Sequence, residues 1–186
     1  MAETRPKKWG LTQVYTGNGK GKTTAALGLA VRAVGAGKRV VWIAFDKGGE
    51  SHYSERNTIR ERFPEIRLDV TGLDRIDAVT GKFRMGVTDE DREEGRRGLE
   101  LMKQAFSDEK ADLVVLDEIN SSTSLGILDE KEVLGILETK PETIELVMTG
   151  RDAPQAFRDL ADLVTEMTLV KHYYYSGVGA REGLDF

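Results

Sequence analysis

The residues with the clearest chemical potential form a glycine-rich segment that ends in lysine and threonine, TGNGKGKTT at positions 16–24. An apolar-leaning segment, residues 11–15, precedes it, and residues 25–31 after it have the composition of a helix. A strand, a glycine-rich turn and a Gly-Lys-Thr that opens a helix are typical of a phosphate-binding P-loop. Glycines let backbone N–H groups converge on phosphate oxygens, and the helix N-terminus favours negative charge. The pattern predicts that Lys22 reaches phosphates and that the Thr23 hydroxyl binds Mg²⁺.

The segment departs from the usual P-loop pattern at its first position. Four residues separate that position from Gly21, as the pattern requires, but Thr16 occupies it and the glycine follows one place later, at Gly17. The segment therefore predicts phosphate binding and leaves the pose of the phosphates open. The alternative, a surface turn that carries a lysine, agrees poorly with the strand and helix patterns on either side.

A second nucleotide signal lies further along the chain, where an apolar run at residues 113–116 ends in Asp117 and Glu118. In P-loop proteins we expect such a strand to run beside the P-loop strand, with its terminal carboxylate reaching Mg²⁺ directly or through water. If the strand continues through both acids, they point to opposite faces, so one of them is expected to act directly at the metal. In many P-loop ATPases the second acid polarises an attacking water, so ATP hydrolysis remains an alternative.

Composition limits the other classes of chemistry. The 186-residue chain carries a net charge of −5 and contains no cysteine. The lack of cysteine excludes thiol catalysis, disulfides and cysteine-ligated metal sites, and the negative charge gives no reason to expect nucleic acid or an anionic membrane as a partner. Residues 1–9 are polar and basic without an apolar signal core, and no run of about 18 apolar residues occurs. We therefore expect a soluble, cytoplasmic, nucleotide-using protein with a short arm, residues 1–9, and a single domain, residues 10–186.

The order of apolar runs and helical segments predicts the fold. Short apolar runs that are typical of buried parallel strands occupy residues 39–45, 113–116, 144–148 and, more weakly, 163–170. Helices are expected at residues 54–62, from a cap at Thr88 to about Ser107, after a cap at Asp129, and with Pro154 in a first turn. This alternation predicts an α/β, three-layer, P-loop NTPase-like (RecA-like) domain with a mostly parallel central sheet. The loop at residues 71–86 is long for a compact domain, which is typical of a functional or mobile segment.

Several segments in matching order resemble one family, the P-loop corrinoid adenosyltransferases (ATP:cob(I)alamin adenosyltransferases). The loop at residues 16–26 is similar to that family's loop almost letter for letter, including the shifted glycine. The other similar segments are residues 32–40, Lys47-Gly48 with Glu55-Arg56-Asn57, residues 116–119, residues 145–154, residues 161–167, Lys171-His172, and Gly177, Ala180, Gly183 and Phe186. The resemblance covers nearly the whole chain.

The resemblance implies an enzyme that transfers the 5′-deoxyadenosyl group of ATP to the cobalt(I) of a corrinoid and releases triphosphate. The reduced cobalt supplies the nucleophile, so no protein nucleophile is needed, in agreement with the lack of cysteine. The resemblance also implies Mg²⁺, an electron-donating reductase and a homodimer, with no nucleic acid and no membrane. Two alternatives remain open from the residues themselves: a P-loop ATPase and a non-catalytic ATP-binding regulator.

The family resemblance also assigns roles to individual residues. The phosphates are expected against Gly17, Asn18, Gly19, Lys20 and Gly21. The resemblance places Lys22, Glu118 and Arg151 in catalysis, Thr23, Glu118 and Asp117 at the metal, Thr24 and Arg32 on the nucleotide, and Lys171 and His172 over the site. For Arg32 the alternative is a solvated helix residue, and for Arg151 it is a charge at a helix entry.

The loop at residues 71–86 departs from the family, whose members carry aromatic residues after the Thr-Gly element to help displace the corrinoid's lower ligand. Here Thr71-Gly72 is followed by Leu73-Asp74-Arg75, and the next aromatic residue is Phe83. We expect Leu73 and Phe83 to form the apolar wall of the corrinoid site. The run Tyr173-Tyr174-Tyr175 has two readings, a surface that faces the corrin or the end of a buried strand.

Overall fold

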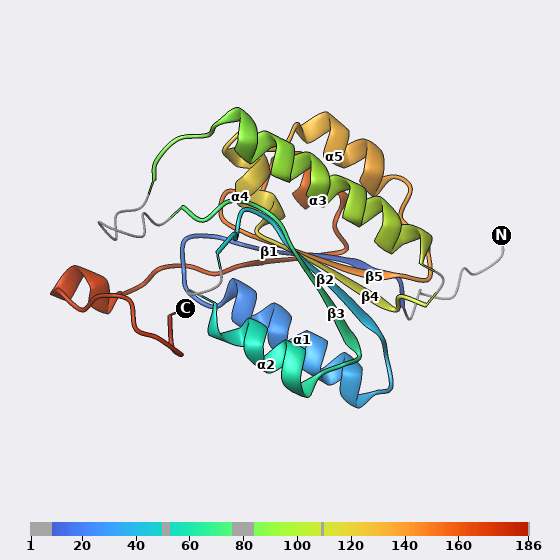
Figure 1. Cartoon of the computed structure of the whole chain (residues 1–186), viewed down its shortest axis with the longest axis horizontal. Helices are drawn as coiled ribbons and strands as arrows, with labels where there is room; N and C mark the ends of the chain where they lie inside the picture. The colour runs from blue at the N-terminus through green and yellow to red at the C-terminus, as the bar shows by residue number, and fades with distance from the viewer. Residues whose placement is uncertain (1–8, 50–52, 76–83, 109, 186) are drawn as a thin grey trace.

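The computed structural model describes residues 9–49, 53–75, 84–108 and 110–185, and a six-stranded sheet lies at its centre (Figure 1). All six strands are parallel, in the order β3-β2-β4-β5-β1-β6. The strands are β1 (Thr12–Thr16), β2 (Val40–Ala44), β3 (Ile66–Val70), β4 (Leu113–Asp117), β5 (Glu145–Thr149) and β6 (Leu163–Glu166). The predicted parallel sheet and its three strong apolar strands are confirmed.

Helices cover both faces of the sheet and complete the predicted three-layer α/β fold (Figure 1). One face packs against α1 (Lys22–Gly35) and α2 (Ser54–Arg62), and the other against α3 (Asp89–Ser107), α4 (Ile119–Ser124), α5 (Glu130–Leu137) and α6 (Gln155–Leu160). In β2, Trp42 joins the apolar cluster under α1 and α2, whereas its neighbours Val41 and Ile43 join the cluster under α3 and α5. Burial on both faces explains why this strand reads as a continuous apolar run.

Two helices begin at the capping residues that the sequence indicates. Thr88 caps α3 through a capping box, in which the Thr88 hydroxyl accepts from Asp91 N at 3.3 Å and the Asp91 carboxylate accepts from Thr88 N at 2.8 Å. Asp129 caps α5 by accepting from Glu132 N at 3.0 Å. Pro154 is the N-cap of α6 rather than a residue of its first turn, so this helix begins one residue later than predicted.

The structure differs from the sequence prediction mainly at the two outermost strands of the sheet, β3 and β6. The prediction lacks β3, because Arg67 and Asp69 interrupt its apolar pattern, as is usual for an edge strand. At the other edge, β6 ends at Glu166 instead of continuing to residue 170, and its four residues are exposed. The prediction also lacks α4, whose sequence INSSTS has no helical apolar period.

One expectation about the site is wrong, because β4 does not run beside the P-loop strand β1. Instead β5 lies between them and pairs with both. Thr149, the last residue of β5, therefore reaches the acidic strand end: its hydroxyl donates to Asp117 Oδ1 at 2.6 Å and accepts from Glu118 N at 3.1 Å. The carboxyl ends of β1, β5 and β4 thus meet at one edge of the sheet, which is where α/β folds bind ligands.

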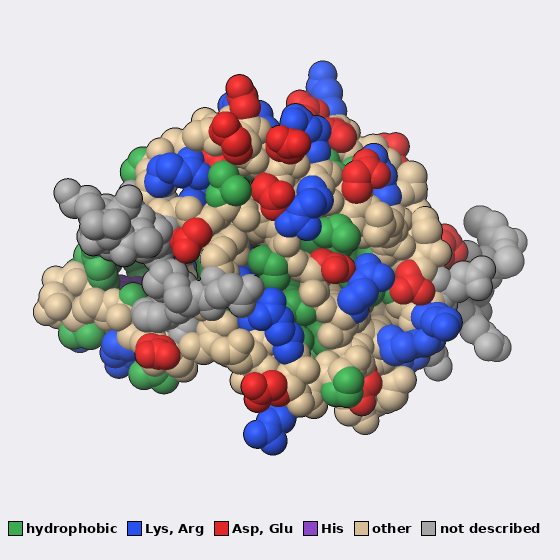
Figure 2. Space-filling view, in the orientation of Figure 1, with side chains coloured by type: hydrophobic (Ala, Val, Ile, Leu, Met, Phe, Trp, Pro, Cys, Tyr) green, Lys and Arg blue, Asp and Glu red, His purple; other side chains and the backbone are tan. Residues whose placement is uncertain are grey.

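Charged side chains of both signs are interspersed over the face shown in Figure 2. This distribution agrees with the modest net charge of −5. The electrostatic features that matter for function are therefore local clusters rather than a field of one sign. None of the described helices is long and apolar enough to cross a membrane.

Candidate active site

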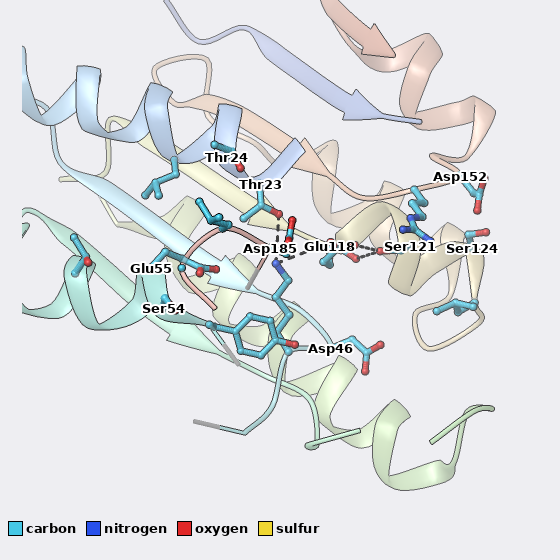
Figure 3. Close-up of a pocket in the computed structure, with 18 residues that line it drawn as sticks. Thr23, Thr24, Asp46, Ser54, Glu55, Glu118, Ser121, Ser124, Asp152 and Asp185 are labelled. Atoms are coloured by element: carbon cyan, nitrogen blue, oxygen red, sulfur yellow. Dashed lines mark hydrogen bonds and ion pairs between the residues drawn. The ribbon is translucent and has the colours of Figure 1, made fainter. Parts of the chain in front are cut away.

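A cavity of about 1130 Å³ lies at the carboxyl edge of the sheet (Figure 3). Its lining comes from the start of α1, the segments after β2, β4 and β5, helix α2, and residues 183–185 near the C-terminus. The predicted site residues Thr23, Thr24, Glu118 and Arg151 all belong to this lining. The cavity therefore joins the first turn of α1, directly after the glycine-rich loop, to the acidic strand end, where a nucleotide site built from these two motifs is expected.

The glycine-rich loop predicted to be a P-loop, residues 17–21, connects β1 to α1 and encloses the lysine that follows it. Gly21 caps α1 with φ = 117°, a left-handed value that favours glycine. Lys22, the first residue of α1, is buried, and its Nζ donates to the carbonyl oxygens of Gly17 and Gly19, each at 2.8 Å. Burial lowers the pKa of Lys22, while Glu118 acts in the opposite direction. A phosphate in the loop could accept from the third donor of the ammonium group or replace one of these carbonyl oxygens as its partner.

The chain that leaves β6 packs closely on the P-loop. A Cβ atom on Gly17 or Gly19 would lie 2.5 or 2.6 Å from the carbonyl oxygen of Met167, which is too close for a side chain. Gly19 N also donates to this carbonyl at 2.6 Å, and Asn18 between the two glycines is exposed. The glycines therefore permit a close backbone contact, in addition to the approach of phosphates that the sequence predicts.

The C-terminal segment reaches back to the P-loop. Lys20 Nζ donates to the Tyr173 hydroxyl at 3.2 Å, and it also contacts the Asp185 carboxylate and the carbonyl oxygen of Leu184. The hydrogen bond from Lys20 lowers the pKa of Asp185, and the Tyr173 hydroxyl adds to this effect. Because Leu184 and Asp185 also line the cavity, the chain end borders the same space as the P-loop.

A buried lysine and two acids form the charged centre of the site. Buried Asp117 accepts hydrogen bonds from Thr23 Oγ1 at 2.9 Å, Thr149 Oγ1 at 2.6 Å and Lys47 Nζ at 2.5 Å. Glu118 Oε1 lies 4.0 Å from Lys47 Nζ. Burial alone would lower the pKa of Lys47, but Asp117 and Glu118 raise it above its ordinary value. Because β4 ends at Asp117, the two carboxylates converge on one ammonium group instead of pointing to opposite faces.

Three acidic residues at this edge adopt the left-handed backbone conformation that favours glycine: Asp46 (φ = 49°), Glu118 (φ = 62°) and Asp152 (φ = 51°). Within the described ranges, no other non-glycine residue has a positive φ, and all three line the cavity. Each follows the carboxyl end of a different strand, β2, β4 or β5. Strained backbone of this kind is concentrated at functional sites, so these residues support the assignment of this edge as the active site.

The oxygen atoms around Lys47 suit a hard divalent cation. Thr23 Oγ1 and the carboxylates of Asp117 and Glu118 are the types of donor that Mg²⁺ prefers. The structure brings all three to the carboxyl edge of the sheet, next to the P-loop. These residues therefore fit the predicted metal site, and the choice of direct ligand between the two acids stays a prediction.

Residues 17–22 and Asp117 are not among the residues that line the cavity, although Asp117 contacts the lining residues Thr23 and Lys47. Arg32, Lys171 and His172 do not line it either. Arg32 is in the last turn of α1 and lines a second cavity of about 320 Å³ at the amino edge of the sheet. His172 caps the 3₁₀ helix η1 (Tyr173–Ser176), where its Nδ1 accepts from Tyr174 N at 3.1 Å, and Lys171 before it is exposed. The roles assigned to Arg32, Lys171 and His172 stay predictions, and the positions of these three residues in the structure add no support.

Of the two residues expected to form an apolar wall for the corrinoid, the structure describes only Leu73. Leu73 is partly exposed and is not among the residues that line the cavity, and Phe83 lies outside the described residues. Tyr174 and Tyr175 belong to η1 and are largely exposed, so the reading of this run as a buried strand end is wrong. The other reading, a surface that faces the corrin, stays a prediction.

Comparison with known proteins decides the family. The family model described as ATP:corrinoid adenosyltransferase BtuR/CobO/CobP matches residues 8–186 of this chain. The chain belongs to this family. It is an enzyme family, and the resemblance seen in the sequence motifs is confirmed.

Individual corrinoid adenosyltransferases are similar over most of their length. The corrinoid adenosyltransferase of Pseudomonas aeruginosa is 34% identical over 100% of this chain and 88% of its own length. The corrinoid adenosyltransferase CobA of Salmonella typhimurium is 35% identical over 95% of this chain and 86% of its own length. An uncharacterized protein of Nostoc sp. is 38% identical over 88% of this chain, and the chain spans 45% of that protein's length.

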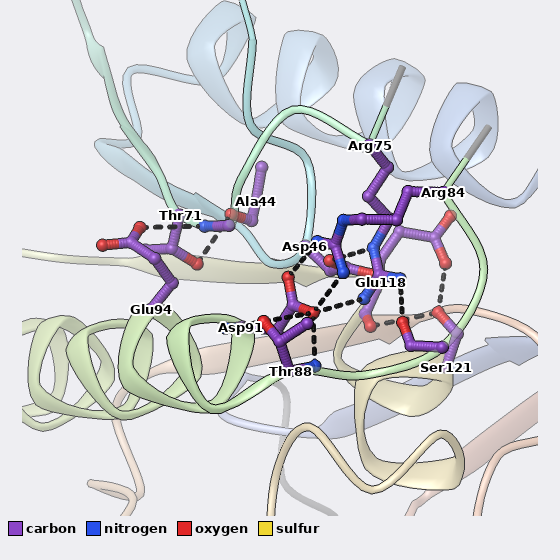
Figure 4. A network of polar contacts seen from close by, with 12 residues as sticks. Ala44, Asp46, Thr71, Arg75, Arg84, Thr88, Asp91, Glu94, Glu118 and Ser121 are labelled. Atoms are coloured by element: carbon purple, nitrogen blue, oxygen red, sulfur yellow. Dashed lines mark hydrogen bonds and ion pairs between the residues drawn. The ribbon is translucent and has the colours of Figure 1, made fainter. Parts of the chain in front are cut away.

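One feature differs from what the adenosyltransferase resemblance implied, because a buried arginine follows the Thr-Gly element (Figure 4). Arg75 Nε donates to Asp46 Oδ1 at 2.8 Å, and Arg75 Nη2 lies 3.7 Å from Asp91 Oδ2. Arg84 donates to both carboxylate oxygens of Asp91, at 2.9 and 2.6 Å. Two arginines and two aspartates therefore join the ends of the 71–86 loop to the end of β2 and to α3.

The sequence analysis did not assign roles to four residues of this adenosyltransferase site: Lys47, Thr149, Asp46 and Asp185. Lys47 had a signal, because it belongs to a Lys-Gly element that the family resemblance marks. The contact between Thr149 and Asp117 depends on β5 lying between β1 and β4. Local sequence patterns do not reveal this strand order. Asp46 and Asp185 are single acids in irregular segments, and nothing in the sequence distinguished them.

Proposed function

We propose that this chain transfers the 5′-deoxyadenosyl group of ATP to the cobalt(I) of a corrinoid and releases triphosphate. The observation that carries the proposal is the cavity that adjoins the glycine-rich loop of a chain in the corrinoid adenosyltransferase family: Thr23 and Glu118 line it, and Asp117 accepts a hydrogen bond from Thr23. The volume of about 1130 Å³ exceeds the roughly 300–1,000 Å³ of a usual small-ligand pocket, which suits a site that takes two substrates.

In the proposed reaction, the electron pair of cobalt(I) forms the Co–C5′ bond while the bond from C5′ to the α-phosphate oxygen breaks. The electron pair of that bond leaves with the triphosphate, so the site must stabilise a leaving group that gains negative charge. Lys22 in the P-loop and Arg151 on the cavity lining supply positive charge for this purpose. Thr23, Glu118 and Asp117 would hold Mg²⁺, which neutralises phosphate charge when bound. The substrate's cobalt is the nucleophile, so none is required from the protein.

The proposal includes components outside this chain. Cobalt(I) arises from the reduction of a more oxidised corrinoid, so an electron-donating reductase has to supply the electron. By resemblance to the family, we also include a cytoplasmic homodimer that acts without nucleic acid or membrane.

Anaerobic incubation with ATP, Mg²⁺ and chemically reduced cobalamin tests the proposal. The absorption spectrum of the corrin reports formation of the Co–C bond, and ion-exchange chromatography separates triphosphate from phosphate. We expect the alkylated corrinoid and triphosphate in equal amounts. Release of phosphate without a spectral change would favour an ATPase in which Asp117 and Glu118 activate water. Binding of ATP with neither product would indicate a regulator.

A further inference from the structure

Lys47 is a buried lysine in the centre of the proposed nucleotide site, and neither sequence motif gives it a role. We propose that its ammonium group fills the cation position between Thr23, Asp117 and Glu118 in the nucleotide-free chain and moves to the triphosphate when ATP and metal bind. Lys47 would then be a phosphate-binding residue in addition to Lys22. This inference rests on the proposed function for the presence of ATP in the cavity.

The position of Lys47 Nζ carries the first part of the proposal. The nitrogen lies 2.5 Å from Asp117 Oδ2, 3.4 Å from Thr23 Oγ1 and 4.0 Å from Glu118 Oε1. These three side chains are the ones that suit a hard divalent cation. The ammonium group also lies over the ring of Tyr53, with Nζ 5.5 Å from the ring centroid. One positive charge of the protein thus neutralises carboxylates that would otherwise repel each other.

The same arrangement prevents Lys47 and a divalent cation from sharing Asp117. The contact is buried, so two cations on one carboxylate would repel each other with little screening by water. Metal binding therefore requires the ammonium group to leave, and a buried charge is stable only beside another partner. The triphosphate is the partner that the proposed function supplies, because Lys47 lines the cavity together with Thr23 and Arg151.

The backbone around Lys47 is anchored, which leaves the movement to its side chain. Lys47 N donates to Thr71 O at 2.9 Å, and Arg56 Nη2 donates to Lys47 O. A Cβ atom on Gly48 would lie 2.3 Å from the carbonyl oxygen of Gly72, so the next residue is pressed against the neighbouring turn. The four-carbon side chain of lysine is flexible enough to carry the charge from Asp117 into the cavity without a change in the backbone.

The same two strands carry a matched control pair at their amino ends. Lys38 precedes β2 and lies 3.1 Å from Asp112, which precedes β4. The side chains of this pair are 37% and 30% exposed, compared with 11% and 1% for Lys47 and Asp117. Since Lys38 is not among the residues that line the cavity, Lys38→Met removes a paired lysine without touching the nucleotide site.

Binding of Mn²⁺ without nucleotide, followed by electron paramagnetic resonance, tests whether Lys47 excludes the metal. The wild type should bind Mn²⁺ weakly alone and tightly when a non-hydrolysable ATP analogue is present. Lys47→Met should raise the nucleotide-free affinity for Mn²⁺ about tenfold or more, because the two carboxylates lose their internal counter-ion. Lys47→Arg and Lys38→Met should both behave as the wild type.

Calorimetric titration with ATP at saturating Mg²⁺ tests whether Lys47 binds phosphate once the metal has displaced it. Under these conditions Lys47→Met should lower the affinity for ATP about tenfold or more, because a charge-assisted hydrogen bond to phosphate is lost. Lys47→Arg should retain most of the affinity, and Lys38→Met should retain all of it. An unchanged affinity in Lys47→Met would overturn the proposal.

Tight binding of Mn²⁺ by the nucleotide-free wild type would also overturn it. This measurement needs no variant, so it decides the proposal if Lys47→Met does not fold. A wild type that binds no ATP even with Mg²⁺ would refute the proposed function and the phosphate-binding role together. Intact adenosyl transfer by the wild type, combined with unchanged metal and ATP binding by Lys47→Met, would refute the role of Lys47 alone.

Discussion

The carboxyl edge of the sheet, where its strands end, and the amino edge, where they begin, carry the same kind of ion pair in very different surroundings. At the carboxyl edge, Lys47 and Asp117 are nearly buried and lie 2.5 Å apart, next to residues with strained backbone. At the amino edge, Lys38 and Asp112 lie 3.1 Å apart and stay partly exposed. Water and salt screen the exposed pair, whereas each member of the buried pair depends on the other for stabilisation. Burial, rather than residue type, therefore decides for which ion pair the loss of one partner must be compensated by a new one, such as a metal ion or a phosphate.

The polar groups of the amino edge hold the chain together. Asp112 accepts from Arg39 N at 3.0 Å, and Glu145 accepts from Leu11 N at 2.8 Å, so both carboxylates satisfy backbone donors at the starts of strands. At the carboxyl edge, Lys22 donates to carbonyl oxygens of its own loop, which a phosphate can replace. One edge stabilises the fold, and the other keeps charged groups on partners that a nucleotide can displace.

The largest effect is expected from breaking the buried pair. Asp117→Asn leaves Lys47 with Glu118, 4.0 Å away, as its remaining ionised partner, so the free energy of unfolding should fall by at most the roughly 3–5 kcal/mol of a broken buried pair. Asp112→Asn at the amino edge should lower it by less than about 1 kcal/mol, because its partner stays solvated. Urea unfolding followed by circular dichroism measures both values. Equal losses at the two edges would mean that burial does not set the strength of these pairs.

A double variant separates the ion pair from the other contacts of Asp117. Asp117→Asn combined with Lys47→Met removes both charges and should recover much of the lost stability. If nothing is recovered, the loss comes from the hydrogen bonds that Thr23 and Thr149 donate to Asp117 rather than from the ion pair.

The second effect concerns nucleotide affinity. Lys22→Ala should weaken the binding of Mg·ATP about 100-fold, since the ammonium group is expected to make charge-assisted hydrogen bonds worth roughly 1.5–3 kcal/mol each. The fold should survive, because the present acceptors of Lys22 are carbonyl oxygens of the loop itself. Calorimetric titration measures the affinity, and thermal melting checks the fold. Lys38→Ala at the amino edge should bind as the wild type does, and equal affinities for the two variants would contradict the role of Lys22.

The features that sequence could predict are those that residues close in the chain determine. The glycine-rich turn before α1 and the caps at Thr88 and Asp129 are local patterns, and the buried strands are continuous apolar runs, so spacing and composition are enough to predict them. The resemblance to a family then supplied the chemistry. Edge strands were harder, because a strand such as β3 is covered by fewer neighbours and lacks the apolar run.

The parts of the site that the sequence did not predict depend on contacts between residues far apart in the chain. Lys47 and Asp117 are 70 positions apart and meet because β2 and β4 are neighbours in the sheet. Arg75 and Asp46 are 29 positions apart and meet because β2 and β3 end side by side. A lysine or an arginine in a loop is ordinarily solvated, so burial of these side chains could be recognised only from the strand order.

The third effect is expected at the metal. Glu118→Gln should lower Mg²⁺-dependent transfer about tenfold or more while the affinity for metal-free ATP changes little, because the amide keeps the shape and loses the charge that a hard cation requires. Transfer assays over a range of Mg²⁺ concentrations measure this. Glu145→Gln, a carboxylate of the amino edge, should leave the Mg²⁺ dependence unchanged. If Asp117→Asn impairs transfer more than Glu118→Gln per folded molecule, Asp117 is the direct ligand.

The smallest effect concerns the cluster of Arg75, Arg84, Asp46 and Asp91, which joins the ends of the 71–86 loop to β2 and α3. The hydrogen bonds from Arg84 hold the pKa of the Asp91 carboxyl below its ordinary range. A carboxylate whose pKa is lowered by folding stabilises the protein above its unfolded pKa of about 3.9 and loses this contribution as the pH falls through the folded value. Arg84→Met lets the folded pKa rise, so the variant should be less stable by roughly 1–2 kcal/mol at neutral pH. The difference from wild type should shrink once the pH falls below about 4.

Urea unfolding at several pH values measures this difference, and Arg92→Met is its matched control. Arg92 pairs with Asp89 at 2.9 Å in the first turn of the same helix, but both side chains are exposed. Screening by water leaves such a pair with little effect on stability, so Arg92→Met should resemble the wild type at every pH. A deficit of Arg84→Met that persists in acid would mean that Arg84 acts through its packing rather than through its charge. The contribution of Arg84 at the carboxyl edge would then come from packing of its side chain. Burial of charge would not explain the difference between Arg84 and the exposed Arg92.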